Sequence, residues 1–138
     1  MGQQSFNLRL NVVILRVRVE GRGKRYAYLR MVLDTGASMT VIPWDAAEAL
    51  GYDPARSRQR IQFMTGSGME AAPTFSVDAM EALGVRLSQV PVLCHDLPQR
   101  SLVDGLLGLS FLKHCRMSVD FKRGTLSLEP STRKQSEV

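Results

Sequence analysis

A carboxylate at a sharp turn is the feature of this sequence best suited to do chemistry. Asp34 follows the apolar run 31–33 and is followed directly by the hydroxyl of Thr35 and by Gly36. Because glycine has no Cβ, it lets backbone amides come close to a carboxylate. An aspartate that only caps its own turn would show the same local pattern. Asp34 is therefore a candidate general acid or base that needs further support.

A mirrored pair of cysteines and histidines is the second candidate for chemistry. Cys94-His95 and His114-Cys115 could together supply four zinc ligands. Ligands to structural zinc usually sit about two to four residues apart on a turn, whereas neighbours in a strand point to opposite faces. We therefore expect half-buried cysteines, surface histidines and no metal site. Two cysteines also cannot build a disulfide framework.

Length and composition indicate a single folded domain. The chain has 138 residues, of which 44% are apolar and 22% charged, close to ordinary globular usage and unlike a disordered or fibrous chain. Its formal charge of +5 is spread along the chain, with a modest cluster at Arg22, Lys24 and Arg25. We interpret this as a solvated basic surface and do not expect a nucleic-acid partner.

The apolar stretch near the start does not predict a membrane anchor. Residues 10–19 are interrupted by Asn11, Arg16 and Arg18 and fall far short of the ~20 residues that a membrane span requires. No secretory signal is recognisable after the first methionine. If the chain is full length, we expect it to be cytoplasmic.

The segments around Asp34 predict that it lies on a loop between two strands. Strands are indicated by β-branched and aromatic residues, and a short helix by a proline in its first turn and a glycine after its end. Trp44 and Tyr52 are interpreted as anchors of that helix. The elements expected here are strands at Leu8–Val19, Tyr26–Leu33 and Met39–Ile42, a hairpin turn at 20–25, and a helix from Pro43 to Leu50.

The second half of the chain predicts more strands and a second short helix. Small residues at 64–69 indicate a hairpin tip, and Pro91 favours an edge strand or a bulge. We expect one mostly-β domain over residues 1–130 and a disordered polar tail at 131–138. The remaining elements expected are strands at 60–63, Ala71–Leu83 and Val85–Cys94, a loop at 95–101, a segment Val103–Leu112 that becomes helical and ends near Cys115, and a hairpin of Met117–Phe121 with Thr125–Leu128.

Residues 32–126 resemble the retropepsin-like aspartic proteases, the family of the retroviral proteases and their cellular relatives. The resemblance implies a closed β-barrel with a flap hairpin and two short helices. It rests on three motifs, which are Asp34-Thr35-Gly36-Ala37-Ser38 after two apolar residues, the flap glycines of Gly66-Ser67-Gly68, and Leu106-Leu107-Gly108 before a helix.

This resemblance implies a homodimeric endopeptidase that acts on peptides or proteins without a cofactor or a metal ion. The chain has one such aspartate motif and is too short for a second lobe, so Asp34 of each subunit would supply one of two catalytic carboxylates. Thr35 resembles the residue that bonds across the two-fold axis, and Gly36 the residue that permits the loop geometry. Ala37 and Ser38 complete the loop. The residues 66–68 would close over the substrate, and 106–108 would pack behind the loop.

Some features depart from the family pattern and leave alternatives open. Ser110 stands where many non-viral relatives carry aspartate, and no interdigitating terminal strands are evident. The dimer interface could come from the strand 126–128 or from the strand 8–19. The alternative functions are a catalytically silent retropepsin-like module for dimerisation or peptide binding, and a basic nucleic-acid-binding domain. The first gives no physical reason for an intact Asp34 motif, and the second lacks an aromatic platform.

Overall fold

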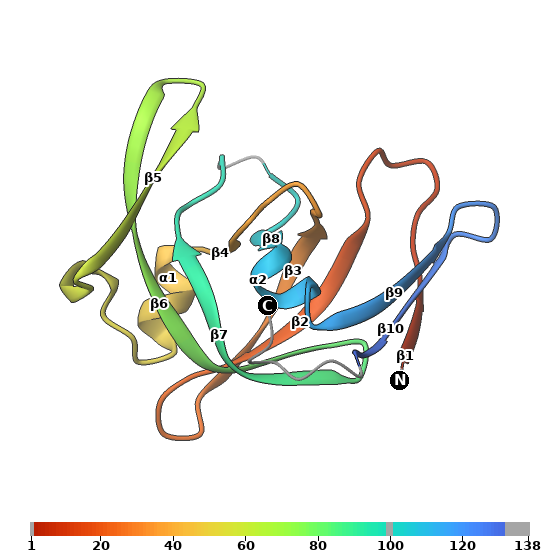
Figure 1. The fold of residues 1–138 in the computed structure, drawn as a ribbon, viewed down its shortest axis with the longest axis horizontal. Helices are drawn as coiled ribbons and strands as arrows, with labels where there is room; N and C mark the ends of the chain where they lie inside the picture. Colours follow the sequence, from red (N-terminus) through yellow and green to blue (C-terminus); the bar gives the residue numbers. More distant parts are fainter. Residues whose placement is uncertain (1, 99–100, 132–138) are drawn as a thin grey trace.

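A computed structural model describes residues 2–98 and 101–131 of the chain. The strands form a 7-stranded sheet and a 3-stranded sheet (Figure 1). The strands are β1 (Gly2–Ser5), β2 (Ile14–Glu20), β3 (Tyr26–Leu33), β4 (Thr40–Ile42), β5 (Gln59–Thr65), β6 (Gly68–Ala82), β7 (Val85–Cys94), β8 (Gly105–Leu107), β9 (Cys115–Asp120) and β10 (Thr125–Pro130). The helices are α1 (Trp44–Ala49) and α2 (Leu109–Leu112), with a 3-10 turn η1 (Pro54–Arg56).

The larger sheet closes on itself into a barrel. Its strand order is β2-β3-β8-β4-β7-β6-β5, and an added pairing of β2 with β6 joins the two ends of the ring. β5 stays outside the ring and pairs only with β6, with which it forms the long hairpin in the upper left of Figure 1. The predicted closed β-barrel with two short helices is confirmed.

Alternating apolar residues of the strands fill the barrel. Leu15, Val17 and Val19 of β2 are fully buried, while the residues between them face outward. Phe111 of α2 is the largest fully buried side chain. Burying a side chain of this kind stabilises the fold by about 1.5–3 kcal/mol. The helix that follows Leu107 is therefore part of the core.

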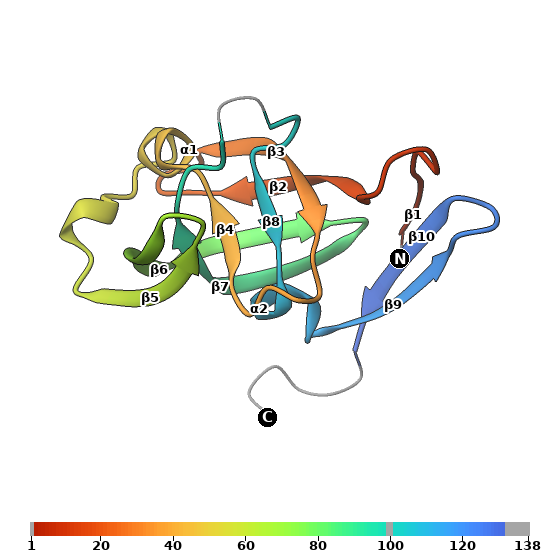
Figure 2. The same cartoon turned by 90° about the horizontal axis from the view of Figure 1, so that it is seen from above.

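The smaller sheet stands beside the barrel and holds both ends of the described chain. β10 lies in its centre, between β1 and β9, and all its pairings are antiparallel. Figure 2 shows this sheet at one end of the molecule, away from the β5–β6 hairpin. The side chains of Leu126 and Leu128 on β10 turn inward and are 1% exposed. The β1 strand was not predicted from the sequence.

The strand expected at 8–19 begins only at Ile14, so the first part of that prediction is wrong. Asn7 explains why the chain turns instead. Its side-chain Oδ1 accepts a hydrogen bond from the Arg9 N–H at 2.9 Å, and its carbonyl accepts one from the Leu10 N–H at 3.2 Å. Such local hydrogen bonds compete with a sheet ladder. Residues 6–13 therefore run as an irregular segment between the two sheets.

Pro91 lies neither on an edge strand nor in a shifted register, contrary to its prediction. β7 has β6 on one side and β4 on the other. Pro91 pairs with Ser76 of β6, and the pairing with β4 starts one residue later, at Val92, so the missing N–H of proline interrupts no ladder bond to β4. The local irregularity is at Gln89, whose φ is +52°.

The remaining expectations are mostly met. The segment expected to become helical enters as β8 and is helical only over Leu109–Leu112. Tyr52 is a core residue, since its hydroxyl donates to the Glu20 carbonyl and accepts from the Asp78 N–H. The predicted tail lies, from residue 132 on, outside the described residues, and the boundary at residue 130 stays a prediction.

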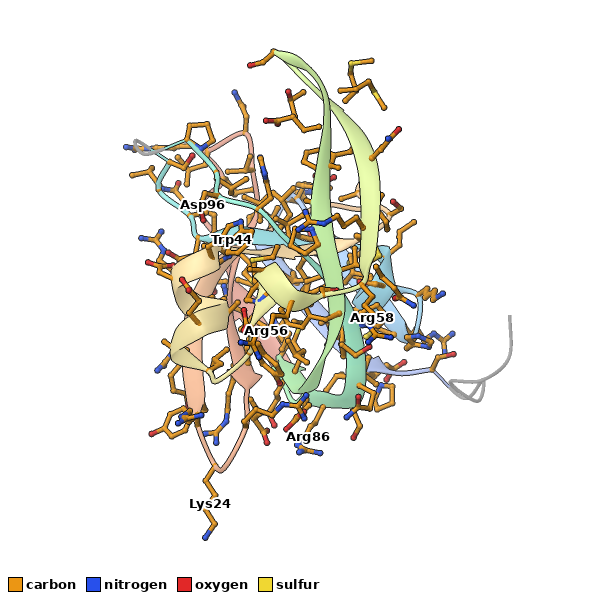
Figure 3. The ribbon with its side chains drawn as sticks, turned by 90° about the vertical axis from the view of Figure 1, so that its left-hand side faces the viewer. Lys24, Trp44, Arg56, Arg58, Arg86 and Asp96 are labelled. Carbon is orange, nitrogen blue, oxygen red and sulfur yellow. The ribbon has the colours of Figure 1, made fainter. Side chains whose placement is uncertain are left out.

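Positive charge is distributed over several elements of the surface. Figure 3 shows Lys24 at the β2–β3 turn, Arg56 and Arg58 near η1, and Arg86 at the start of β7. Trp44 lies beside Asp96, whose Oδ1 accepts a hydrogen bond from the Trp44 N–H at 2.9 Å (Figure 3). Among the described residues, no helix has the length and apolarity that crossing a membrane would demand.

Candidate active site

Asp34 leaves the barrel at a fixed point. It follows the last residue of β3, which pairs in parallel with β8 through Leu33 and Leu107. The Asp34 N–H then donates to the Leu107 carbonyl at 3.0 Å. The side chain of Asp34 is only partly exposed, whereas Thr35 and Gly36 beyond it are exposed. The backbone of the candidate catalytic residue is therefore anchored, and the loop after it faces outward.

The loop turns tightly around the carboxylate, as the glycine predicted. The Gly36 N–H donates to Asp34 Oδ1 at 3.0 Å, and the Ala37 N–H donates to the Asp34 carbonyl at 3.2 Å. A Cβ added to Gly36 would lie 3.3 Å from Asp34 Oδ1. Glycine at this position therefore keeps open the close approach of amide and carboxylate. These bonds fix the carboxylate relative to the loop.

The segment after β8 packs directly behind the loop. The N–H groups of Leu109 and Ser110 donate to the carbonyls of Ala37 and Ser38, at 2.8 and 3.1 Å. A Cβ on Gly108 would lie 2.6 Å from the carbonyl oxygens of both Ala37 and Met39, closer than such contacts allow. Only glycine lets the start of α2 sit this close to the loop.

A buried chain of hydroxyls reinforces this contact. Thr40 is completely buried, and its Oγ1 accepts a hydrogen bond from the Gly108 N–H at 3.1 Å. Ser110 Oγ accepts from the Thr40 N–H at 2.9 Å and donates to the Pro91 carbonyl at 2.7 Å. β4, α2 and β7 are thereby joined through two side chains. In the described part of the chain, no buried side-chain nitrogen or oxygen lacks a hydrogen-bond partner.

Sequence reasoning noted Ser110 only as a departure from the family pattern, and it missed Thr40. A threonine in a short apolar strand looks like any other strand residue, because it is β-branched. The spacing of the two residues gives no sign that they meet, since they are 70 positions apart in the chain. Their partnership is visible only once the barrel brings β4 and α2 together.

Leu106 and Leu107 point to opposite sides of β8, as neighbours in a strand do. Leu107 is fully buried in the main core, consistent with the predicted packing behind the loop. Leu106 belongs to a second apolar cluster beneath the β5–β6 hairpin. The members of this cluster are Met39, Val41, Phe63, Ala72, Leu93 and Leu106.

The predicted flap is the hairpin of β5 and β6, with Gly66 and Ser67 at its tip. Thr65 Oγ1 donates to the Gly68 carbonyl at 3.1 Å and accepts from the Ser67 N–H at 3.2 Å. Gly68 has a φ of +115°, which favours glycine strongly. Lower down, the Phe63 ring meets His95 edge-on at 5.0 Å. The hairpin exists as expected, and its closure over a peptide stays a prediction.

An apolar groove of about 730 Å³ opens in front of the loop. Asp34 and Thr35 form one part of its wall, and Asp34 is the only charged residue that lines it. Its other walls are the segment 6–13, the end of β3, and β9 with the residue that follows it. The groove is lined by Phe6, Leu8, Leu10, Asn11, Val12, Val13, Val32, Leu33, Asp34, Thr35, Met117, Val119 and Phe121.

The cysteines and histidines do not form a second centre in the part of the chain that the structure describes. No group of three or more histidine, cysteine or acidic residues there is placed to hold a metal ion. Burial raises the pKa of the Cys94 thiol to about 12 and that of Cys115 to about 11, so both stay protonated at neutral pH. Cys94 is fully buried and not half-buried as expected.

Comparison with known proteins agrees with this geometry. The family model for aspartyl proteases matches residues 15–111, which include the loop, the hairpin 59–82 and the start of α2. A crystal structure of a retropepsin-like aspartic protease from Rickettsia conorii is similar to this chain, with a TM-score of 0.67 and 19% identity over 94% of this chain and 99% of that chain. The sequence matches no curated protein. The chain belongs to the aspartyl protease family and has a retropepsin-like fold.

Proposed function

We propose that this protein is an aspartic endopeptidase, active as a homodimer in which the Asp34 carboxylates of two subunits activate a water molecule between them. The observation that carries this proposal is the setting of Asp34. Its backbone is fixed by Leu107 from behind, its Oδ1 is held by the Gly36 amide, and it borders an open apolar groove. Such a carboxylate is rigidly placed and accessible from one side.

One carboxylate per chain is insufficient for this chemistry. Hydrolysis of a peptide bond needs a base to take a proton from water and an acid to support the developing oxyanion and protonate the leaving amine. Two carboxylates within hydrogen-bonding distance cannot both ionise cheaply, so they share one proton and supply both roles. The partner of Asp34 in this scheme is Asp34 of a second subunit, and a closed two-fold dimer is the commonest oligomer.

In the proposed reaction, the ionised Asp34 takes a proton from the bound water as that water attacks the scissile carbonyl. The protonated Asp34 donates a hydrogen bond to the oxygen that becomes negative. The C–N bond then breaks, and the amine leaves with a proton supplied by the pair. The acid and base roles of the two carboxylates are exchanged in the process, so a further proton transfer restores the starting state.

The other loop and flap residues have supporting roles in this proposal. Thr35 is exposed at the front of the loop, in the position from which its hydroxyl would bond to the partner loop. Gly66, Ser67 and Gly68 would fold over the bound peptide and exclude water. The substrate is therefore an extended peptide segment lying between the flap and the paired carboxylates.

Hydrolysis of a mixed peptide library tests the proposal. The wild type should cleave it, and Asp34→Asn should lose activity by a factor of about 10² or more, because an amide can neither ionise nor share the proton. The Asp34→Asn protein should keep its thermal midpoint, since the side chain is partly exposed. The matched control is Asp53→Asn, an exposed carboxylate paired with Arg56 at 3.2 Å, which should remain active.

Two outcomes would count against the proposal. An Asp34→Asn protein that keeps most of the activity would show that another group does the chemistry. A folded, dimeric wild type that neither cleaves the library nor binds a statine-type inhibitor, whose hydroxyl imitates the attacking water, would favour a silent binding module.

A further inference from the structure

The groove in front of Asp34 has walls that are unusually apolar for a surface. Three of its side chains come from the irregular segment 6–13, namely Leu8, Leu10 and Val12, which are 52%, 40% and 43% exposed. Two come from the other side, Met117 and Phe121, which are 37% and 68% exposed. Single exposed apolar residues are ordinary, but a contiguous apolar groove marks an interaction site.

The segment 6–13 is held in a defined position although it belongs to no sheet. The Phe6 N–H donates to the Gly124 carbonyl at 2.7 Å, and the Val13 carbonyl accepts from the Leu33 N–H at 2.8 Å. Leu8 packs so closely on Gly124 that a Cβ there would lie 3.0 Å from its Cγ. The segment is thus fastened to the β9–β10 turn at one end and to the end of β3 at the other. Its apolar side chains face a preformed groove.

We propose that this groove is the surface on which a second copy of the chain docks. The inference rests on the proposed function, because that function requires a second Asp34 next to the first. Asp34 and Thr35 lie in the wall of the groove, so a partner that covers it is brought against the catalytic loop. In a two-fold dimer the same patch meets itself, and an apolar patch is complementary to its own copy.

Charge favours the same occupant. Each chain carries a formal charge of +5, which opposes association of two copies in general. None of the lysines and arginines lines the groove, however, and its only charged residue is Asp34. Two copies can therefore meet through this face without bringing positive side chains together. A strongly acidic partner would find no complementary charge in it.

The structure also decides between the two interfaces that the sequence left open. β10 already has β1 on one side and β9 on the other, and the side chains of Leu126 and Leu128 are buried in their own chain. The strand 126–128 thus has neither a free edge nor a free apolar face. The segment 8–13 has exposed apolar side chains, and the terminal strands are paired within one chain. Dimers would form from folded monomers through side-chain contact.

Sedimentation of the full chain over a range of concentrations tests this docking surface. The wild type should show a reversible monomer–dimer equilibrium. Leu8→Asp and Phe121→Asp should each raise the dimer dissociation constant by about tenfold or more, because each places a charge in a desolvated apolar contact. The matched control is Tyr26→Asp, another apolar-to-acidic change at a residue that is 54% exposed and lies on the outer face of β3. It should leave the dimer unchanged.

The thermal midpoint of each variant monitors its folding, and Leu8→Ala with Phe121→Ala replaces any aspartate variant that unfolds. A wild type that stays monomeric at every concentration, or groove variants that dimerise as well as the wild type, would overturn the docking surface. If groove variants lose the dimer but the wild-type dimer hydrolyses no peptide, the docking surface stands and the proposed function fails. If hydrolysis and dimerisation both survive the groove variants, the docking surface alone fails.

Discussion

The two sides of the Asp34 loop are built differently. Behind the loop, Gly108, Thr40 and Ser110 are buried, closely packed and fully hydrogen-bonded. In front of it, Leu8 and Phe121 leave apolar surface in contact with water. The back is complete within one chain, whereas the front is an open apolar surface. The contrast indicates that a single subunit fixes the position of its carboxylate and relies on a partner to complete the site.

The largest effect on the back of the loop is expected from Gly108→Ala. The added methyl group would clash with the carbonyl oxygens of Ala37 and Met39, and backbone cannot move aside as a flexible side chain can. We expect a loss of about 1–3 kcal/mol or more in the free energy of unfolding, measured by urea denaturation at fixed protein concentration.

The matched control for this glycine is Gly66→Ala at the hairpin tip. A Cβ at Gly66 meets nothing within 4 Å, so stability should stay near that of the wild type. Equal destabilisation by the two alanines would mean that the contact between α2 and the loop is not as tight as described.

Thr40→Val should have the next largest effect, again on the back of the loop. Valine keeps the shape but removes the oxygen that accepts from the Gly108 N–H, which leaves a buried donor unpaired. The expected loss in the free energy of unfolding is about 1–3 kcal/mol. Ser110→Ala should act in the same direction, because it leaves the Thr40 N–H unpaired. Ser118→Ala on the exposed face of β9 serves as the control, and a comparable loss there would remove the special role of the buried pair.

The same substitution at the front, Thr35→Val, should produce a different result. Thr35 is exposed, so the stability of the monomer should hardly change. If its hydroxyl bonds across the dimer axis, the dimer dissociation constant should rise by roughly threefold to tenfold, which corresponds to the ~0.5–1.5 kcal/mol of a typical hydrogen bond. Sedimentation measures this change. A Thr35→Val protein that is unstable as a monomer but dimerises normally would reverse the contrast between front and back.

A smaller effect is expected far from the loop, at Glu20. Both of its carboxylate oxygens accept hydrogen bonds from Arg86 at 3.1 Å, and these bonds hold the pKa of Glu20 below its ordinary value of 4.5. A lowered folded-state pKa adds stability above the unfolded pKa, and that stability is lost as pH falls through the folded pKa. Because the pair is partly exposed, the effect should be small.

Urea midpoints of the wild type and Glu20→Gln check this prediction. The wild type should be the more stable protein at neutral pH, and the difference should shrink as the pH falls below 4.5. A difference that grows on acidification would show that the ion pair with Arg86 does not stabilise the fold.

The sequence was informative where local chemistry decides the structure. Asp34, Gly36 and the two hairpin glycines could be identified because turns and close approaches need particular residues. Distant contacts could not be identified in this way. The link from Thr40 to Ser110 depends on barrel closure, and the turn at Asn7 depends on a side-chain hydrogen bond competing with the sheet. The groove in front of Asp34 combines residues from both ends of the chain, so no single stretch of sequence predicts it.

Mixing of wild-type and Asp34→Asn subunits is the most direct test that one active site needs two Asp34 carboxylates. At constant total protein and after exchange of subunits, only dimers of two wild-type chains should hydrolyse a peptide. Activity should then follow the square of the wild-type fraction and fall to about one-quarter at an equal mixture. Activity in direct proportion to the wild-type fraction, about one-half at an equal mixture, would show that a single Asp34 is enough and would contradict the shared site.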